Sequence, residues 1–327
     1  MPSLQLPRRT FLKLGAGLSG LAAAIPGAQA APLPAQPAAA QPNGKPKTPT
    51  RFQIACMTLP YSRFPLQRAL TGLRAAGYTY VAWGTSHTEQ AGGKQIPVLA
   101  ADATAEQART LATRCRDLGL EPVMMFSGVY PEANNGLEVL RQRLVQAGAA
   151  KIPQVLTFGH TKGGNHKLWV ERLKDLAPRA RDNGVILVIK QHGGETGTGA
   201  ACAKITREIN HDHIKVNYDS GNVMDYLRLS PAQVLADFRE CADDVRSFCI
   251  KDHRDFPPPH GDCGPGLGEI DHYRLLHPVA FTGRTIPLCC ENISAPHVPR
   301  PNKPEDVDAL ARRAREFLDL VVRGIQA

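Results

Sequence analysis

The sequence predicts a single-domain α/β fold, a (β/α)8 TIM barrel. Strand-like and helix-like segments alternate from residue 51 onward, and there are eight such pairs. Strict alternation of this kind implies a parallel sheet covered by helices. The segment 185–190 is a nearly continuous apolar run, which is typical of a strand buried on both faces. A doubly wound open sheet is the alternative, but no Gly-x-Gly-x-x-Gly motif follows the first strand.

The individual elements follow from apolar periodicity and from the residues that end each segment. The strands are predicted at 51–59, 78–83, 121–126, 153–158, 185–190, 214–218, 245–251 and 285–290. The helices are predicted at 65–76, 105–118, 137–147, 167–181, 199–209, 231–241, 272–276 and 305–325. Gly77 and Gly119 follow the ends of two helices, and Ser230 followed by Pro231 begins another.

The N-terminal segment has the features of an export signal. Residues 1–30 contain the pair Arg8 and Arg9, similar to a twin-arginine motif, and then an apolar stretch too short for a membrane span. Residues 31–50 are rich in Ala, Pro and Gln, which predicts a linker. We therefore expect a barrel over 51–327 that is periplasmic or secreted, with no membrane attachment after signal cleavage. A retained N-terminal anchor is the alternative.

Composition narrows the classes of partner. The formal net charge is +9, and no basic run stands out, so we expect no nucleic-acid partner. The eight cysteines include no Cys-x-x-Cys pair, which argues against a zinc ribbon. Buried thiols are favoured, and one or two disulfides stay open for an exported chain. The oligomeric state is open as well.

Polar side chains gather at the predicted carboxyl ends of six strands, where barrel enzymes keep their chemistry. The sixth strand ends at Asp219, and Ser220-Gly221-Asn222 then predicts a tight turn. Buried charge is costly unless it is paired or metal-bound, so packing alone does not explain such convergence. The residues are His87, His160, Lys190, His192, Asp219, Asn222, Lys251, Asp252, His253 and Glu291.

These residues divide into three predicted roles. His192, Asp219 and Glu291 could hold a divalent cation such as Mn, Mg, Co or Zn, which would stabilise an enediolate. Lys190, Lys251 and Glu291 are predicted catalytic groups; the lysines would stabilise an oxyanion, or act as acid and base if burial lowers their pKa values. Ion pairing of each lysine with a carboxylate is the alternative. The predicted substrate-binding residues are His87, His160, Asn222, Asp252 and His253.

Three short motifs and one longer segment carry a family resemblance. These are Asn217-Tyr218-Asp219-Ser220-Gly221-Asn222, Ile250-Lys251-Asp252, the Gly-rich segment 264–271 and Cys290-Glu291-Asn292. In this order they resemble the xylose isomerase-like TIM barrel superfamily of sugar phosphate isomerases and epimerases, over about 51–325.

The resemblance implies a metal set of Glu, Asp, His and Glu on strands five to eight, and this chain departs from it. Asp219 and Glu291 match, whereas Lys190 and Cys249 stand at the other two positions, and Asn222 stands where many members have His. A rebuilt metal site that uses His192 and a metal-free site with Lys190 as the positive charge both stay open.

The resemblance implies an isomerase or epimerase that removes a proton next to the carbonyl of a small-molecule carbohydrate, and the N-terminal segment adds the expectation that this enzyme is exported. A lyase acting on 3-keto-glycosides by the same enolate chemistry is one alternative, and a non-catalytic sugar-binding protein is another. A phosphodiesterase of the endonuclease IV kind is disfavoured, because the chain offers few candidate metal ligands for the trinuclear zinc site that such an enzyme needs. The long loop 254–268 is expected to act as a lid or a substrate wall.

Overall fold

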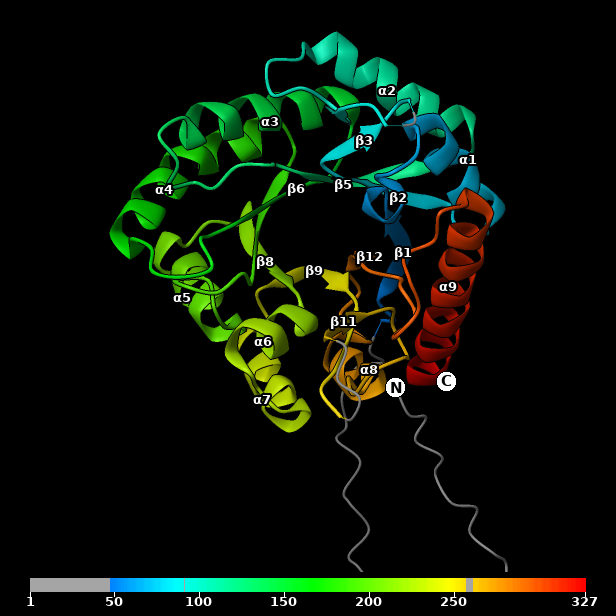
Figure 1. The fold of residues 1–327 in the computed structure, drawn as a ribbon. Helices are drawn as coiled ribbons and strands as arrows, with labels where there is room; N and C mark the ends of the chain where they lie inside the picture. Colours follow the sequence, from blue (N-terminus) through cyan, green and yellow to red (C-terminus); the bar gives the residue numbers. More distant parts are fainter. Residues whose placement is uncertain (1–47, 91, 257–260) are drawn as a thin grey trace, which may run out of the picture. The chain divides into compact units, whose positions relative to one another are not determined.

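The computed structural model describes residues 48–90, 92–256 and 261–327. The predicted signal and residues 31–47 of the predicted linker lie outside this range. Eight parallel strands close into a barrel in the order β1-β12-β9-β8-β7-β6-β5-β2 (Figure 1). They are β1 (Arg51–Met57), β2 (Tyr80–Trp83), β5 (Glu121–Phe126), β6 (Gln154–Phe158), β7 (Ile186–Lys190), β8 (Ile214–Tyr218), β9 (Val245–Ile250) and β12 (Thr285–Cys290).

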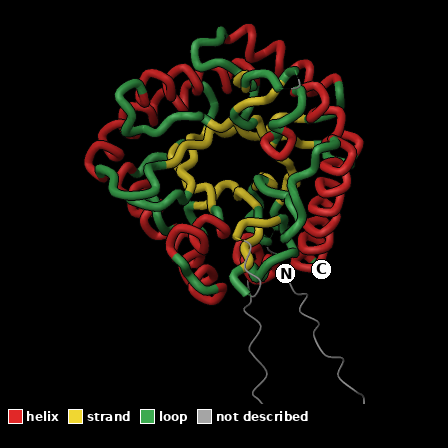
Figure 2. Tube along the Cα trace, in the orientation of Figure 1, coloured by secondary structure: helices red, strands yellow, loops and turns green. Residues whose placement is uncertain are grey.

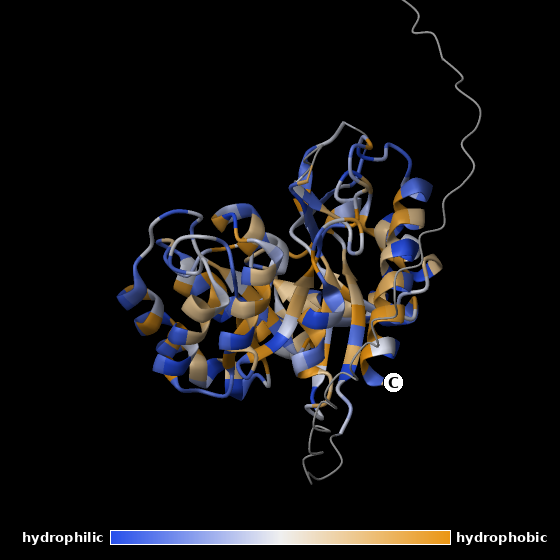
Figure 3. Ribbon diagram, turned by 90° about the horizontal axis from the view of Figure 1, so that it is seen from below, coloured by the Kyte–Doolittle hydropathy of each residue, from blue (hydrophilic) through white to orange (hydrophobic). Residues whose placement is uncertain are grey.

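Helices surround this ring of strands, as Figure 2 shows. They are α1 (Leu66–Ala75), α2 (Ala105–Asp117), α3 (Gly136–Ala150), α4 (His166–Asp182), α5 (Gly199–Ile209), α6 (Ser220–Leu227), α7 (Pro231–Cys241), α8 (His272–Leu276) and α9 (Pro304–Gln326). The helix ribbons carry both apolar and polar segments, as expected for helices with one face on the barrel (Figure 3). The predicted single-domain (β/α)8 barrel is confirmed.

Strand alternation separates two layers of apolar core. On β7, Leu187 and Ile189 pack outward against the helices, and Val188 packs inside the barrel. On β9, Phe248 belongs to the outer layer and Cys249 to the inner one. Because side chains alternate along a strand, polar residues in register with the inner layer face the barrel interior at its carboxyl end.

The structure corrects one predicted turn. Ser220-Gly221-Asn222 is the first turn of α6, a helix that the sequence analysis missed. The Asp219 side chain is the N-cap, because its Oδ1 accepts a hydrogen bond from the Asn222 backbone N–H at 3.0 Å. The cap residues that mark a turn in sequence here begin a helix.

Two small hairpins extend beyond the barrel strands. β3 (Ser86–Thr88) pairs with β4 (Gln95–Pro97), and β10 (Asp252–Arg254) pairs with β11 (Gly261–Cys263). The second hairpin occupies part of the loop predicted as a lid or wall, of which residues 257–260 lie outside the described range. Two 3-10 turns, η1 (Leu59–Tyr61) and η2 (His277–Val279), complete the described elements.

The eight cysteines all lie within the described ranges, and each is a buried free thiol. The favoured prediction is therefore confirmed in the structure. Within the part of the chain that the structure describes, no helix has the length and apolar character needed to cross a membrane.

Candidate functional site at the carboxyl ends of the strands

A cluster of ionised side chains lies inside the barrel at the carboxyl ends of four strands. Two-residue alternation places Lys190 above Val188 on β7, and Glu291 above Cys289 at the end of β12. Asp219 follows β8 and Lys251 follows β9. All four residues come from the predicted set, and the structure brings them together.

Lys190 lies between the two carboxylates. Its Nζ donates to Oε1 and Oε2 of Glu291, each at 2.8 Å, and lies 3.2 Å from Oδ2 of Asp219. Only 4% of the Lys190 side chain is exposed, and the rings of Phe126 and Phe158 lie within 5.6 and 5.9 Å of Nζ. The ammonium is thus enclosed by two acids and two aromatic faces.

Lys251 supplies a second ammonium on the other side of Asp219. Its Nζ donates to Oδ1 of Asn222 at 2.5 Å and lies 3.5 Å from Oδ2 of Asp219. It lies 3.0 Å from Asp262 and 3.7 Å from Glu291. A side chain at Gly221 would not fit, because a Cβ there would lie 2.6 Å from Cγ of Lys251. The glycine that indicated a turn is needed for this close approach.

The surrounding charges keep both lysines protonated. Burial alone would lower the pKa of Lys190, but Glu291 and Asp219 outweigh it, and the pKa is raised. The pKa of Lys251 is also raised, since Asp219, Glu291 and Asp262 outweigh its burial. The alternative in which burial lowers the lysine pKa values is therefore wrong. Oxyanion stabilisation and ion pairing fit the geometry.

The two carboxylates titrate differently. Burial raises the pKa of Asp219 to about 6, although both lysines oppose the shift. Burial would also raise the pKa of Glu291, but Lys190 and Lys251 outweigh it and hold the pKa well below its usual range. The pair can thus accept a proton near neutral pH, as two carboxylates that share one site do.

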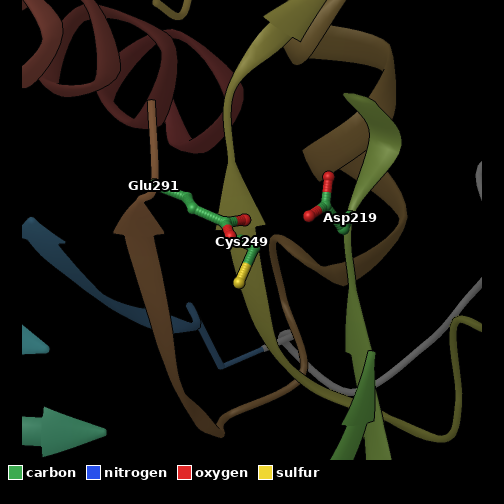
Figure 4. Close-up of side chains that lie close together, drawn as sticks. All are labelled: Asp219, Cys249 and Glu291. Carbon is green, nitrogen blue, oxygen red and sulfur yellow. The ribbon is translucent and has the colours of Figure 1, made fainter. Parts of the chain in front are cut away.

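Among the described residues, one group of three side chains is close enough to hold a metal ion: Asp219, Cys249 and Glu291. The side chains of Asp219, just after β8, and Glu291, just after β12, extend toward each other, and Cys249 on β9 lies between their strands (Figure 4). As they stand they fit a divalent cation poorly, because Lys190 Nζ donates to both carboxylate oxygens of Glu291. Burial also raises the pKa of the Cys249 thiol, and a thiol must lose its proton to bind a metal.

His192, a predicted metal ligand, is not part of that group. Its Nδ1 donates to the carbonyl of Gly159 at 2.8 Å, and burial lowers its pKa. Its ring lies 4.7 Å from Phe158 and 5.2 Å from Tyr226. His192 thus belongs to an aromatic wall beside the ion cluster, which we define as Tyr130, Phe158, His160, His192 and Tyr226.

The predicted substrate-binding residues occupy different environments. His160 lies in the aromatic wall with 48% of its side chain exposed, and Asn222 contacts Lys251. His87 is buried in β3, where its Nδ1 donates to the Phe64 carbonyl at 2.9 Å.

Asp252 and His253 are fully buried beside the cluster. The Asp252 carboxylate accepts backbone hydrogen bonds from His253, Gly266 and Ile270 at 2.9, 2.9 and 3.0 Å. This holds the glycine-rich segment against β10, which is a structural role. His253 lies 3.5 Å from Asp262, and its pKa is raised by that carboxylate and by Asp255.

A cavity of about 240 Å³ opens beside the cluster, and its size suits a small molecule. Lys251, Asp262 and Glu291 line its inner wall. Arg63 and Arg300 also line it and are exposed. Lys251, Asp262 and Glu291 are therefore the residues of the ion cluster that a ligand in this cavity would contact.

Sequence reasoning missed two residues of this site. Asp262 lies in β11, and only the hairpin fold brings it to Lys251. Gln191 follows Lys190, and its Oε1 accepts a hydrogen bond from the Asp219 backbone N–H at 2.7 Å. Its place directly after a strand was a usable signal, because it shares the strand end with Lys190.

Several solved structures share this fold. An L-ribulose 3-epimerase superposes with a TM-score of 0.63 at 18% identity, covering 84% of this chain and 95% of its own. A xylose isomerase-like TIM barrel protein from Mycobacterium smegmatis in complex with magnesium gives 0.63 at 17% identity, covering 86% and 98%. A D-psicose 3-epimerase, solved in the presence of D-fructose, gives 0.58 at 13% identity, covering 83% and 99%.

A search of curated protein sequences found no match. The family description "Xylose isomerase-like TIM barrel" matches residues 70–319, which is most of the chain. Together with the closed barrel and the residues at its strand ends, this match shows that the chain belongs to the xylose isomerase-like TIM barrel family.

Proposed function

We propose that the protein is an enzyme that isomerises or epimerises a small carbohydrate by transferring a proton at the carbon next to a carbonyl group. One observation carries this proposal. Two ammonium groups lie within 3.7 Å of two carboxylates at the carboxyl end of a barrel, beside a small cavity. The sugar epimerases among the structures of the same fold support this reaction class.

Each residue has a defined task in this proposal. Glu291 lines the cavity and takes the proton from carbon, and Asp219, whose pKa is the higher of the two, then holds the acquired proton. Lys251 also lines the cavity and donates to the carbonyl oxygen as negative charge develops there. A solvent-exchanged proton delivered to the neighbouring carbon, with the hydroxyl proton passing to the former carbonyl oxygen, gives isomerisation. Delivery of a proton to the opposite face of the same carbon, by an acid on that face, gives epimerisation.

The predicted divalent cation would supply Lewis-acid stabilisation of the same enediolate if it were bound. In this chain the ammonium of Lys190 already donates to Glu291 and lies 3.2 Å from Asp219. No step above depends on a metal.

The aromatic wall presents apolar ring faces beside the polar cluster, and such faces suit the C–H groups of a sugar. Arg63 and Arg300, which line the cavity, also suit a ligand that carries negative charge.

Product analysis tests the reaction class. The protein would be incubated with aldoses, ketoses and 3-keto-glycosides, and the products would be separated by chromatography. We expect a new epimer or an aldose–ketose pair that is lost in Glu291→Gln. Release of the aglycone from keto-glycosides alone would support the lyase alternative instead. Sugar binding without turnover would support the binding-protein alternative.

We propose that the enzyme acts outside the cytoplasm. This rests on Arg8, Arg9 and the apolar stretch that follows them, because these have the pattern of an export signal. Replacing both arginines with lysine should leave the protein in the cytoplasmic fraction of cells in which the unchanged chain reaches the periplasm. Equal distribution of the two chains would contradict export by this route.

A further inference from the structure

We infer that Lys190 takes the place of a divalent cation in this barrel, so that the site works without a metal. This inference rests on the proposed function, because it names the positive charge that holds the two carboxylates of that reaction in place. Lys190 acts through Glu291 and Asp219 and is therefore a positioning residue.

The ammonium of Lys190 lies where a bridging cation would lie. Nζ lies 2.8 Å from both oxygens of Glu291 and 3.2 Å from Oδ2 of Asp219. The two carboxylates face each other across the barrel interior in Figure 4. A cation that bridges them would have to occupy the space that the ammonium occupies, since metal–oxygen bonds are only about 2.0–2.6 Å long.

The ammonium of Lys190 is enclosed, so it cannot move into solvent to make room for a metal ion. The Lys190 side chain is 4% exposed, and Phe126 and Phe158 stand beside Nζ. An incoming metal ion would force this charge away from both carboxylates while it stayed buried. Leaving one partner of a buried ion pair without the other is strongly unfavourable.

The two lysines also balance most of the negative charge in the site. Lys190 and Lys251 provide two positive charges, and the carboxylates that contact them are Asp219, Glu291 and Asp262. The lysines already compensate two of the three negative charges, so the attraction for a divalent ion is weak. His192 does not add a ligand, because it lies outside the group formed by Asp219, Cys249 and Glu291.

Metal titration tests the inference without any substrate. Wild-type protein, Lys190→Glu and the control Lys167→Glu would be treated with chelator, dialysed and titrated with MnCl2, with binding followed by calorimetry and by the Mn²⁺ electron paramagnetic resonance signal. Lys167→Glu makes the same charge change on a side chain that is 87% exposed. Circular dichroism would establish that each variant is folded.

We expect Lys190→Glu to bind one Mn²⁺ per chain about 100-fold more tightly than the wild type or Lys167→Glu, because it replaces an ammonium with a third carboxylate. A wild-type protein that binds one Mn²⁺ at micromolar concentration, and loses it in Asp219→Asn, would overturn the inference. So would a folded Lys190→Glu that gains no affinity. If Lys190→Glu does not fold, the wild-type titration decides alone, since stoichiometric binding overturns the inference and its absence supports it.

A measurement of turnover gives a second test, which is separate from the metal titration. Turnover should be unchanged after treatment with EDTA. A protein without turnover on any sugar would contradict the proposed function and leave the metal titration as it stands, so the two failures are distinguishable.

Discussion

Nζ of Lys190 lies 2.8 Å from each carboxylate oxygen of Glu291, although 101 residues separate them in the chain. Lys190 ends β7 and Glu291 follows β12, and these strands are not neighbours in the barrel. The pair therefore crosses the barrel interior. Several measurable properties depend on it.

Removal of this ammonium should destabilise the fold in a pH-dependent way. Lys190→Met leaves two buried carboxylates facing each other, and we expect a loss of about 3 kcal/mol in the free energy of unfolding near pH 8. Without Lys190 the folded-state pKa of each carboxyl is higher than in the wild type, because both lose a neighbouring positive charge. The penalty should therefore shrink as pH falls and the carboxyls become protonated. Urea unfolding near pH 8, and again at a lower pH at which the carboxyls are protonated, measures both effects.

Lys167, which is exposed, supplies a control for that experiment. Lys167→Met removes a side chain that is 87% exposed and should change the unfolding free energy little. A Lys190→Met penalty that is equal at both pH values would show that the lost packing of the stem, rather than the charge, causes the instability.

Protonation of Asp219 should limit kcat/KM at acidic pH. Its pKa is raised from 3.8 to about 6, chiefly by burial, so kcat/KM should rise through about pH 6 and then level off. A carboxyl whose folded pKa is raised gives a stability contribution that is complete below pH 3.8 and lost as pH rises through about 6. A rate profile with no inflection between pH 5 and 7 would contradict this assignment.

Asp219→Asn isolates the stability effect, because it removes the titrating group and keeps a side chain that can cap α6. The stability of the wild type relative to this variant should fall between about pH 4 and pH 7. Denaturant unfolding of both proteins at several pH values measures the difference, and a constant difference would count against a raised pKa.

Asp252 should behave as a structural residue, although its position at a strand end predicted substrate binding. Asp252→Ala removes the acceptor of three backbone hydrogen bonds, so we expect a loss of about 3 kcal/mol in stability. Asp252→Asn keeps one acceptor and should lose less. Thermal unfolding and KM together decide, since a raised KM with an unchanged Tm would indicate substrate contact instead.

The aromatic wall should contribute to substrate binding. Tyr226 is 39% exposed and its ring lies 5.2 Å from that of His192. Tyr226→Ala should raise KM about tenfold with little change in Tm, because it removes an exposed ring face. Tyr226→Phe keeps the ring and should resemble the wild type; an equal rise in KM for both variants would assign the effect to the hydroxyl.

Much of the fold could be predicted because the apolar periodicity of each segment agrees with the residues that begin and end it. The strands 214–218 and 285–290 and the helices 199–209 and 231–241 have the predicted limits, since Gly or capping residues bound them. Helix α6 was missed because Asp219-Ser220-Gly221 satisfies a turn as well as a helix N-terminus. The choice depends on the buried cap and on Gln191, which holds the Asp219 backbone N–H.

The position of the site could be predicted from the sequence, but the roles of its residues could be predicted only in part. Alternation along parallel strands predicts that Lys190, Asp219, Lys251 and Glu291 converge. It does not give the pKa of a lysine, which depends on how many carboxylates reach it in space. Asp262 could not be identified as a site residue from the sequence, because its contact with Lys251 depends on the hairpin formed by β10 and β11.

Proton exchange with solvent shows whether Glu291 removes the proton next to the sugar carbonyl. The wild type and Glu291→Gln would be incubated with ketoses and aldoses in D2O with EDTA, and the substrates followed by proton NMR. With the wild type we expect loss of the proton signal at the carbon next to the carbonyl, and in Glu291→Gln this loss should be slowed by at least about 100-fold. Conversion of a sugar without deuterium at that carbon, or equal exchange by the two proteins, would contradict this expectation.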